Sequence, residues 1–262
     1  MKNKTIQLTL LVSLGLMLAA CTAVGETVQL GDQRHDYQTV ELGALESPDI
    51  RIDMGAGKLL VSGGASQLME ADFIYNVAAL EPEIEAGQNQ LRILTPDTRV
   101  NFTSLFDLED YRNEWDMRFN DDVAMQLDIR LGLGQANLDL GSLTLTRLDI
   151  DTGAGQLDLN LVGSPLGKFI LDAGVGDVRV DMSGAWSQDV NVNIDTGVGE
   201  LTLILPQNTA VSVEIEGGIV DINADGFSRS NGRYTNDAQR GGAEIVIRID
   251  AGIGEINLLL TN

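Results

Sequence analysis

Carboxylates that recur at fixed offsets from a G-x-G motif are the residues of this chain whose types and spacing could do chemistry. The first glycine of the motif stands at positions 55, 132, 153, 174, 197, 218 and 252. Acids stand two residues before it in six copies, and three residues after it in the later copies. The first set is Asp53, Asp151, Asp172, Asp195, Glu216 and Asp250, with Arg130 in the remaining copy, and the second set is Asp177, Glu200, Asp221 and Glu255.

Stacking of the copies would bring these acids together. If neighbouring copies lie about 4.8 Å apart, like charges face one another and destabilise the stack. Calcium, a hard cation that takes oxygen ligands, would relieve the repulsion. A solvated outer face that blocks edge-to-edge association is the alternative. The possible calcium ligands are Asp172, Asp177, Asp195, Glu200, Glu216, Asp221, Asp250 and Glu255.

Catalysis has little other material in this sequence. His35 is the single histidine, so neither a catalytic triad nor a histidine-rich metal site is indicated. Carboxylate pairs are compatible with a glycosidase, but these acids recur with the repeat, which indicates architecture. We therefore expect a protein that is not an enzyme and that needs no cofactor apart from the possible calcium. The enzyme alternative is a polysaccharide lyase on a β-helix, with Arg179 or Arg248 as the basic residue.

The repeat itself predicts the elements that position the acids. After the copy at position 132, the spacings are 21, 21, 23, 21 and 34 residues, and a fixed period of this size is typical of stacked architectures. Apolar residues stand five and three residues before the first glycine, and one and four residues after it. The period-two alternation of a half-buried strand thus shifts phase at the glycines, which indicates a bulge or a corner.

We therefore predict an all-β fold over residues 125–262, a β-solenoid or a pair of stacked sheets with a period of about 21 residues. Each copy contributes two short strands that meet at a G-x-G corner, and stacking buries its apolar positions in columns. A phosphate-binding loop, the competing interpretation of G-x-G, occurs once and opens a helix. Here the motif occurs seven times and a strand pattern follows it, although Val220 replaces the second glycine of one copy.

The first twenty residues resemble a signal peptide. Lys2 and Lys4 precede an apolar segment too short to span a membrane comfortably, and small residues then lead to Cys21. The string "LAAC" also resembles the lipobox of bacterial lipoproteins, which implies cleavage before Cys21 and a diacylglycerol on its sulfur. An ordinary secreted protein is the alternative. Because no later segment is long and apolar enough to span a bilayer, we expect an exported chain anchored to the membrane by lipid.

Composition restricts the partners. The chain carries 39 acidic and 17 basic residues, for a net charge of −22, which repels phosphate backbones and excludes nucleic acid as an expected partner.

The span 225–242 interrupts the period and is locally basic. Insertions in repeat proteins become loops on one face, and such loops often bind. The candidate contact residues there are Arg229, Asn231, Arg233, Tyr234 and Arg240, with a tolerated surface loop as the alternative.

We expect four segments: a helical signal peptide over 1–20, a lipidated tether with a first strand over 21–46, an N-terminal β segment over 47–124, and the repeat domain over 125–262. The stretches "MGAGKLLVSGGASQLMEADFIYN", "EWDMRF" and "LGLGQANLDLGSLTLTRLDIDTGAGQLDLNL" resemble the toast-rack family of bacterial lipoproteins. That family is similar to the putative-adhesin and LiaF-like β domains of the cell envelope.

The resemblance implies a β-helix-like stack at the extracytoplasmic face of a bacterial membrane, without catalytic residues. It implies a non-catalytic adhesin or binding module, whose partner would be wall glycan or an envelope protein. A LiaF-like regulatory or structural module is the alternative, and the lyase is the third possibility. Because fold analogy is a weak argument for function, the partner stays open at this point.

Overall fold

The computed structural model describes residues 26–27, 30–43, 47–96, 100–101, 110–238 and 241–261. The signal peptide and Cys21 lie outside these residues. The chain divides into two units. The smaller comprises residues 1–29 and 97–110, and in its described part β1 (Glu26–Thr27) pairs in parallel with β7 (Val100–Asn101). The larger unit comprises residues 30–96 and 111–262 and contains the repeat.

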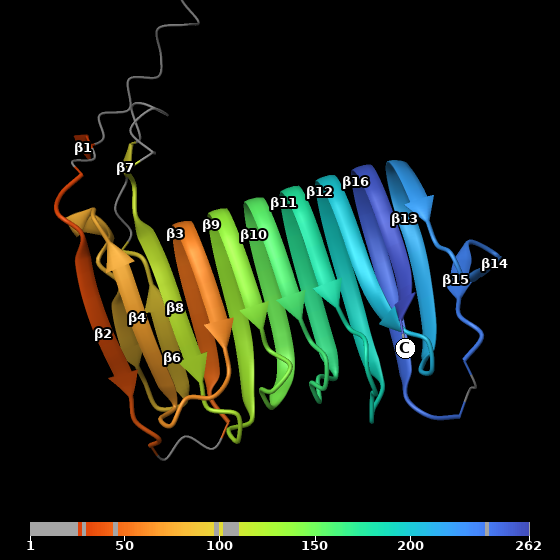
Figure 1. Ribbon diagram of the computed structural model, residues 1–262, viewed down its shortest axis with the longest axis horizontal. Coiled ribbons are helices and arrows are strands. Elements are labelled where there is room, and N and C mark those ends of the chain that lie inside the picture. Colours follow the sequence, from red (N-terminus) through yellow and green to blue (C-terminus); the bar gives the residue numbers. More distant parts are fainter. Residues whose placement is uncertain are drawn as a thin grey trace, which may run out of the picture. The chain divides into compact units, whose positions relative to one another are not determined.

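Seven long parallel strands form the body of the larger unit, each with a G-x-G segment or its equivalent in its middle (Figure 1). Their order in the sheet is β3–β9–β10–β11–β12–β16–β13. Their bounds are β3 (Asp49–Ser62), β9 (Met125–Asp139), β10 (Leu145–Asn160), β11 (Lys168–Asp181), β12 (Val190–Pro206), β13 (Ala210–Asn223) and β16 (Glu244–Thr261).

Chain connectivity requires each long strand to fold back on itself. A straight strand as long as β9 would extend about 50 Å, yet the five residues from Leu140 to Thr144 lead to the start of the parallel neighbour β10. Five residues span at most about 18 Å. The strand must therefore turn at its glycines, so that each copy is one coil with a strand before the corner and a strand after it. The predicted β-solenoid with G-x-G corners is confirmed.

Glycine is required at these corners for two reasons. At Gly155 φ is +143°, a backbone conformation that other residues rarely adopt. A Cβ built at Gly155 would also overlap the carbonyl oxygen of Gly134 in the next coil, and a Cβ at Gly153 would overlap that of Gly132. The same contacts repeat along the stack, so the two glycine columns let neighbouring backbones approach. In β13, where Val220 replaces the second glycine, the positive φ moves to Gly217.

The core lies between the strands before the corner and those after it. The apolar columns five and three residues before the first glycine, and four residues after it, are buried in all coils apart from Ile215 and Ile222 in β13, which are half-buried. The fourth apolar column, one residue after the glycine, is not buried. Its members include Leu133, Val175 and Val198, which are about half exposed. The expectation that stacking buries every apolar column is thus wrong for this one.

At the end of the stack where β3 lies, different strands extend the layer before the corner and the layer after it. Before the corner, β3 pairs with β6 (Gln90–Leu94), which forms a hairpin with β5 (Glu83–Ala86). After the corner, β3 pairs with β8 (Asn113–Phe119), followed by the antiparallel strands β4 (Met69–Tyr75) and β2 (Arg34–Val40). A short 3-10 helix, Ala78–Leu80, precedes β5. The rings of Trp115 on β8 and Phe73 on β4 pack edge to face, with their centroids 5.4 Å apart, and both side chains are fully buried.

The opposite end shows a strand exchange that the repeat does not reveal. The last strand, β16, lies between β12 and β13, so the final two coils stack in the reverse of their chain order. The insertion that separates them forms the hairpin of β14 (Ser228–Ser230) and β15 (Arg233–Thr235). Because β15 pairs antiparallel with residues 212–214 of β13, the insertion extends the edge of the sheet.

Candidate functional site

The acidic residues lie in register on neighbouring coils, as the repeat predicts. In the column before the corner, Asp172, Asp195, Asp250 and Glu216 are successive neighbours. In the column after it, the successive neighbours are Asp177, Glu200, Glu255 and Asp221. All eight residues are exposed. The larger unit therefore carries two parallel rows of negative charge along its last four coils.

These rows do not converge on one point. In the part of the chain that the structure describes, no group of three or more histidine, cysteine, aspartate or glutamate side chains could hold a metal ion. Two of the acids have local partners: Asn257 donates to Glu200 at 3.0 Å, and Asn223 donates to Glu255 at 2.8 Å. These amides screen part of the repulsion, and calcium binding stays a prediction.

The basic insertion lies at the edge of the sheet, and its side chains contact one another. The Arg229 guanidinium lies over the ring of Tyr234, 5.2 Å from the centroid, and Arg233 forms an ion pair of 3.3 Å with Glu214. Tyr234 is buried, whereas Asn231 is exposed and has a φ of +51°. Arg240 lies outside the described residues. A role of this loop in binding stays a prediction.

The residues considered for enzyme chemistry are not brought together. Arg248 lies before the corner of β16, and Arg179 lies after the corner of β11. His35 is on β2, where its Nδ1 is 3.3 Å from a carboxylate oxygen of Asp72. The structure thus forms no shared site from these three residues.

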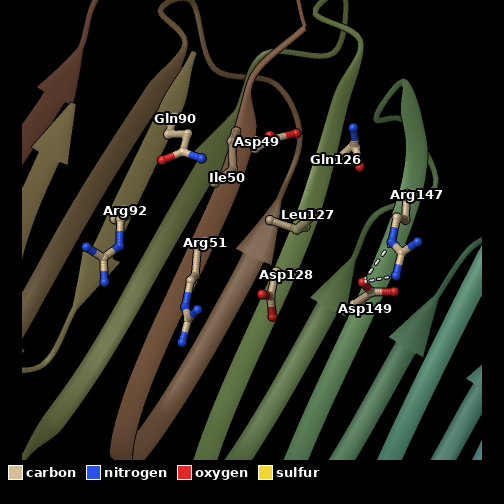
Figure 2. Close-up of a pocket in the computed structure, with 10 residues that line it drawn as sticks. All are labelled: Asp49, Ile50, Arg51, Gln90, Arg92, Gln126, Leu127, Asp128, Arg147 and Asp149. Carbon is tan, nitrogen blue, oxygen red and sulfur yellow. Dashed lines mark hydrogen bonds and ion pairs between the residues drawn. The ribbon is translucent and has the colours of Figure 1, made fainter. Parts of the chain in front are cut away.

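A cleft of roughly 390 Å³ on the outer face of the strands before the corner is the best-defined site. Residues from β6, β3, β9 and β10 line it (Figure 2). Its floor is formed at Ile50 and Leu127, whose side chains point into the core. The polar lining residues are Asp49, Arg51, Gln90, Arg92, Gln126, Asp128, Arg147 and Asp149.

Charge changes sign along one row of side chains that crosses this cleft. Arg92 lies directly opposite Arg51, which lies opposite Asp128, which lies opposite Asp149. Four neighbouring strands thus present two positive side chains followed by two negative ones, in the order seen in Figure 2. Neighbours of opposite sign on adjacent strands attract, whereas the two arginines repel each other. Along this one row the charge changes sign between Arg51 and Asp128, although Asp49 on β3 and Arg147 on β10 place the opposite charge on each side of the cleft.

Ion pairs within strands, or to the neighbouring hairpin strand, hold these side chains in place. Arg51 pairs with Asp53 at 3.0 Å, Arg92 with Glu85 at 2.9 Å, and Arg147 with Asp149 at 2.7 Å. Nε of Arg51 and Oδ1 of Asp149 are buried and have no hydrogen-bond partner, and the same holds for Oδ1 of Asp72 and Oγ of Ser164 elsewhere in the described residues. Unsatisfied buried polar atoms are rare in folded proteins, and two of these four belong to residues that line this cleft.

No pattern in the sequence points directly to this cleft. Aligning the copies shows that the position four residues before the glycine varies in charge, with Arg51, Asp128 and Asp149 in the first copies. Arg92, however, belongs to no copy of the repeat. Its place beside Arg51 follows from the hairpin of β5 and β6, which pairs with β3 over residues 49–53.

The fold defines the class of protein: it is a two-layer β-solenoid, which presents an extended surface. The acidic rows, the basic insertion and the cleft all lie on its outer faces. The chain belongs to the toast-rack family: the model of the N-terminal domain of toast_rack, DUF2154, matches residues 29–169 and 159–204. The resemblance seen in the sequence is thus confirmed.

A solved structure with a TM-score above 0.5 supports the fold. A putative cell adhesion protein from Clostridium sporogenes is 28% identical, covers 88% of this chain and all of its own, and superposes with a TM-score of 0.63. A putative adhesin from Bacteroides fragilis is 11% identical over 90% of this chain and all of its own, with a TM-score of 0.46. No curated protein matches the chain. Among the described residues, none forms a helix that is long and apolar enough to cross a membrane.

Proposed function

We propose that this protein is a non-catalytic binding protein of the bacterial cell envelope, held at the extracytoplasmic face by lipid on Cys21, and that it binds peptidoglycan. The observation that carries the proposal is the row of charged side chains across the cleft, with Arg92 and Arg51 beside Asp128 and Asp149. The name of the similar Clostridium sporogenes structure, a putative cell adhesion protein, agrees with a binding role.

The chemistry of the cleft favours a ligand that carries both charges. A guanidinium binds carboxylates through parallel hydrogen bonds, and a carboxylate binds an ammonium group. Because adjacent strands lie about 4.8 Å apart, a ligand needs its two charged groups about 5 Å from each other to bridge Arg51 and Asp128, and about 10 Å to bridge Arg51 and Asp149. The peptide stems of bacterial cell walls carry carboxylates and amino groups at such separations.

The two unsatisfied atoms point to the same ligand class. Nε of Arg51 is a donor suited to a carboxylate, and Oδ1 of Asp149 is an acceptor suited to an ammonium group. The Arg51 and Asp149 side chains are about one-third exposed, so a ligand in the cleft can contact their exposed atoms. Nε and Oδ1 themselves are buried, so the two side chains would have to reorient on binding before a ligand could satisfy these atoms.

Co-sedimentation with purified sacculi tests this function. The protein is the chain from residue 21 onward, with Cys21→Ser to prevent lipidation. We expect saturable pelleting, weakened at least about tenfold when Arg51→Gln and Arg92→Gln are combined, since two charge-assisted contacts are lost. The matched control is Arg179→Gln, an exposed arginine after the corner, which should bind like the unaltered protein.

Failure of the unaltered chain to pellet would overturn wall binding and favour a protein partner, as in a LiaF-like module. Equal pelleting of the double variant would instead show that wall material binds outside the cleft. Soluble fragments that retain the peptide stem should compete, whereas glycan strands without peptide should not.

A further inference from the structure

The apolar column one residue after the first glycine, which is not buried in the core, forms a continuous ridge along the corners of the coils. Its members are successive neighbours across the sheet. The five larger side chains are exposed: Leu133 by 54%, Val175 by 56%, Val198 by 48%, Ile253 by 55% and Ile219 by 76%. In the order of the coils, the corner ridge is Ala56, Leu133, Ala154, Val175, Val198, Ile253 and Ile219.

The corner geometry explains the exposure. Each ridge residue follows the first glycine of its corner and, in six of the seven coils, precedes the second. Because the strand shifts phase there, this side chain points away from the core. Glycines on either side leave it without side-chain neighbours in its own strand. Exposed aliphatic side chains scattered singly are ordinary, but a continuous row of them marks an interaction surface.

Charge divides the ridge into two parts. Beside Val175, Val198, Ile253 and Ile219, every coil carries one acid before the corner and another after it, the two acidic rows described above. Beside the first three coils the flanks are mixed and include Lys58, Arg130, Gln135 and Gln156. Four of the five larger aliphatic side chains, all but Leu133, therefore lie in the part of the ridge that has eight flanking carboxylates.

These flanks decide what can cover the ridge. A second copy packed ridge to ridge would bring acidic rows against acidic rows, and like charges at such an interface are costly. An anionic lipid surface would meet the same repulsion. A partner with apolar residues between two rows of lysine or arginine would bury the ridge and pair the carboxylates.

Spacing selects the secondary structure of that partner. Coils repeat about every 4.8 Å along the ridge, and a helix laid along it presents one apolar turn about every 5.4 Å. Over the three steps between four coils, the mismatch accumulates to only about 2 Å. An extended strand repeats its face about every 6.7 Å and would be out of register by more than one whole coil.

From the row of exposed aliphatic side chains, the paired acidic flanks and this spacing, we propose that the corner ridge from Val175 to Ile219 binds a basic amphipathic helix of a partner polypeptide. Such a helix has a narrow apolar stripe with lysine or arginine on both sides. This binding surface lies on the corners and is separate from the charged cleft, so it does not depend on peptidoglycan binding.

A synthetic peptide provides the test. The probe is a fluorescent helix of about 18 residues, or five turns, with a leucine stripe and lysine elsewhere. The protein is the chain from residue 21 onward with Cys21→Ser, and fluorescence anisotropy gives the affinity. We expect saturable binding that combined Val198→Ser and Ile253→Ser weaken at least tenfold, and that weakens progressively with added sodium chloride.

Two matched controls separate the ridge from general charge attraction. Leu133→Ser alters an equally exposed ridge residue outside the acidic part and should change affinity less than twofold. A peptide of the same composition without a stripe should bind at least tenfold more weakly than the probe, and a peptide with glutamate for lysine should not bind.

Equal affinity of the double ridge variant, or equal binding of the stripeless peptide, would overturn the proposal. Sedimentation of the protein alone tests for a second copy: a dimer lost in the ridge variant would also overturn it. Because both substituted residues are exposed, unchanged melting temperatures should show that the variants are folded.

Discussion

The side-chain amide of Asn113 donates a hydrogen bond of 2.7 Å to the carbonyl oxygen of Ala56, at the corner of the first coil. The Tyr111 hydroxyl donates to the same oxygen at 2.9 Å, and burial raises the pKa of that phenol. The side-chain oxygen Oδ1 of Asn113 in turn accepts a hydrogen bond of 2.9 Å from the indole N–H of Trp115. Asn113 thus joins the corner to the aromatic residues that close this end of the core.

Replacing Asn113 should therefore destabilise the fold. In Asn113→Ala the buried indole N–H loses its acceptor, and leaving one buried polar group unsatisfied costs about 1–3 kcal/mol. Urea unfolding gives the free energy. Asn208→Ala, at an exposed asparagine, is the control and should stay within about 0.5 kcal/mol of the unaltered protein. Equal stability of the two variants would refute the role of Asn113.

The glycine columns predict opposite outcomes at two equivalent positions. A Cβ at Gly153 would overlap the Gly132 carbonyl, whereas a Cβ at Gly55, in the first coil, has no atom within 4 Å. Overpacking costs about 1–3 kcal/mol, so Gly153→Ala should lower stability by that amount and Gly55→Ala by no more than about 0.5 kcal/mol. Thermal melts of both variants check this, and a tolerant Gly153 would contradict the close backbone approach.

Two isoleucines of β16 separate the core from the ridge. Ile249 is 2% exposed and Ile253 is 55% exposed. Ile249→Ala should cost about 2–5 kcal/mol because it leaves a cavity, whereas Ile253→Ala should cost less than about 1 kcal/mol because its side chain is half in solvent. Denaturant unfolding of the pair measures the difference. A similar large cost at both positions would mean that the ridge contributes to folding.

Stability should depend on the ionisation of Glu70. Hydrogen bonds from the Ser66 hydroxyl and then the Ser66 backbone N–H lower the pKa of Glu70, and Arg118 adds an ion pair of 2.6 Å. A carboxyl whose pKa is lowered on folding stabilises the protein fully above its ordinary value of 4.5, and this contribution disappears as the pH falls through the lowered pKa.

Glu70→Gln should therefore melt at a lower temperature than the unaltered protein at neutral pH, and the two melting curves should converge as the pH falls below about 4. Melting temperatures measured across this range test the sign. A gap that stays constant with pH would show that the contacts of Glu70 do not depend on its charge.

Screening the acidic rows should stabilise the larger unit. Raising sodium chloride from about 10 mM to about 300 mM shortens the range of repulsion between neighbouring coils, so the melting temperature should rise.

The calcium prediction has a sharper criterion: millimolar calcium should raise the melting temperature more than magnesium does at equal ionic strength. The same melt with Asp195→Asn and Asp250→Asn should lose that excess, and no excess in the unaltered protein would remove the prediction.

How far the sequence predicts this structure depends on the range of the interactions involved. Period, corners and the in-register acids follow from the sequence because parallel coils place like positions side by side. The exchange of β13 and β16 does not, because both strands carry the same apolar columns, such as Ile215 and Ile249, and fit either place. The charged cleft also escapes prediction, since Arg92 reaches Arg51 through a hairpin outside the repeat.

The ridge shows a different limit. Residues such as Val175 look like core positions because they are apolar in every copy. Their outward direction depends on where within the corner the strand changes phase, and the G-x-G pattern alone allows either direction. Only the backbone conformation at the glycines, with positive φ at Gly176 rather than at Gly174, fixes the side chain between them on the outer surface.

The place of β16 between β12 and β13 has a consequence for synthesis of the chain. A ribosome produces β13 well before β16, yet β13 has no long parallel neighbour until β16 has emerged. The coils up to β12 can stack in the order of their synthesis. The coil formed by β13 cannot, and its apolar side chains stay exposed until β16 has been made. Completion of this end therefore waits for the synthesis of β16, and a chain interrupted before β16 lacks it altogether.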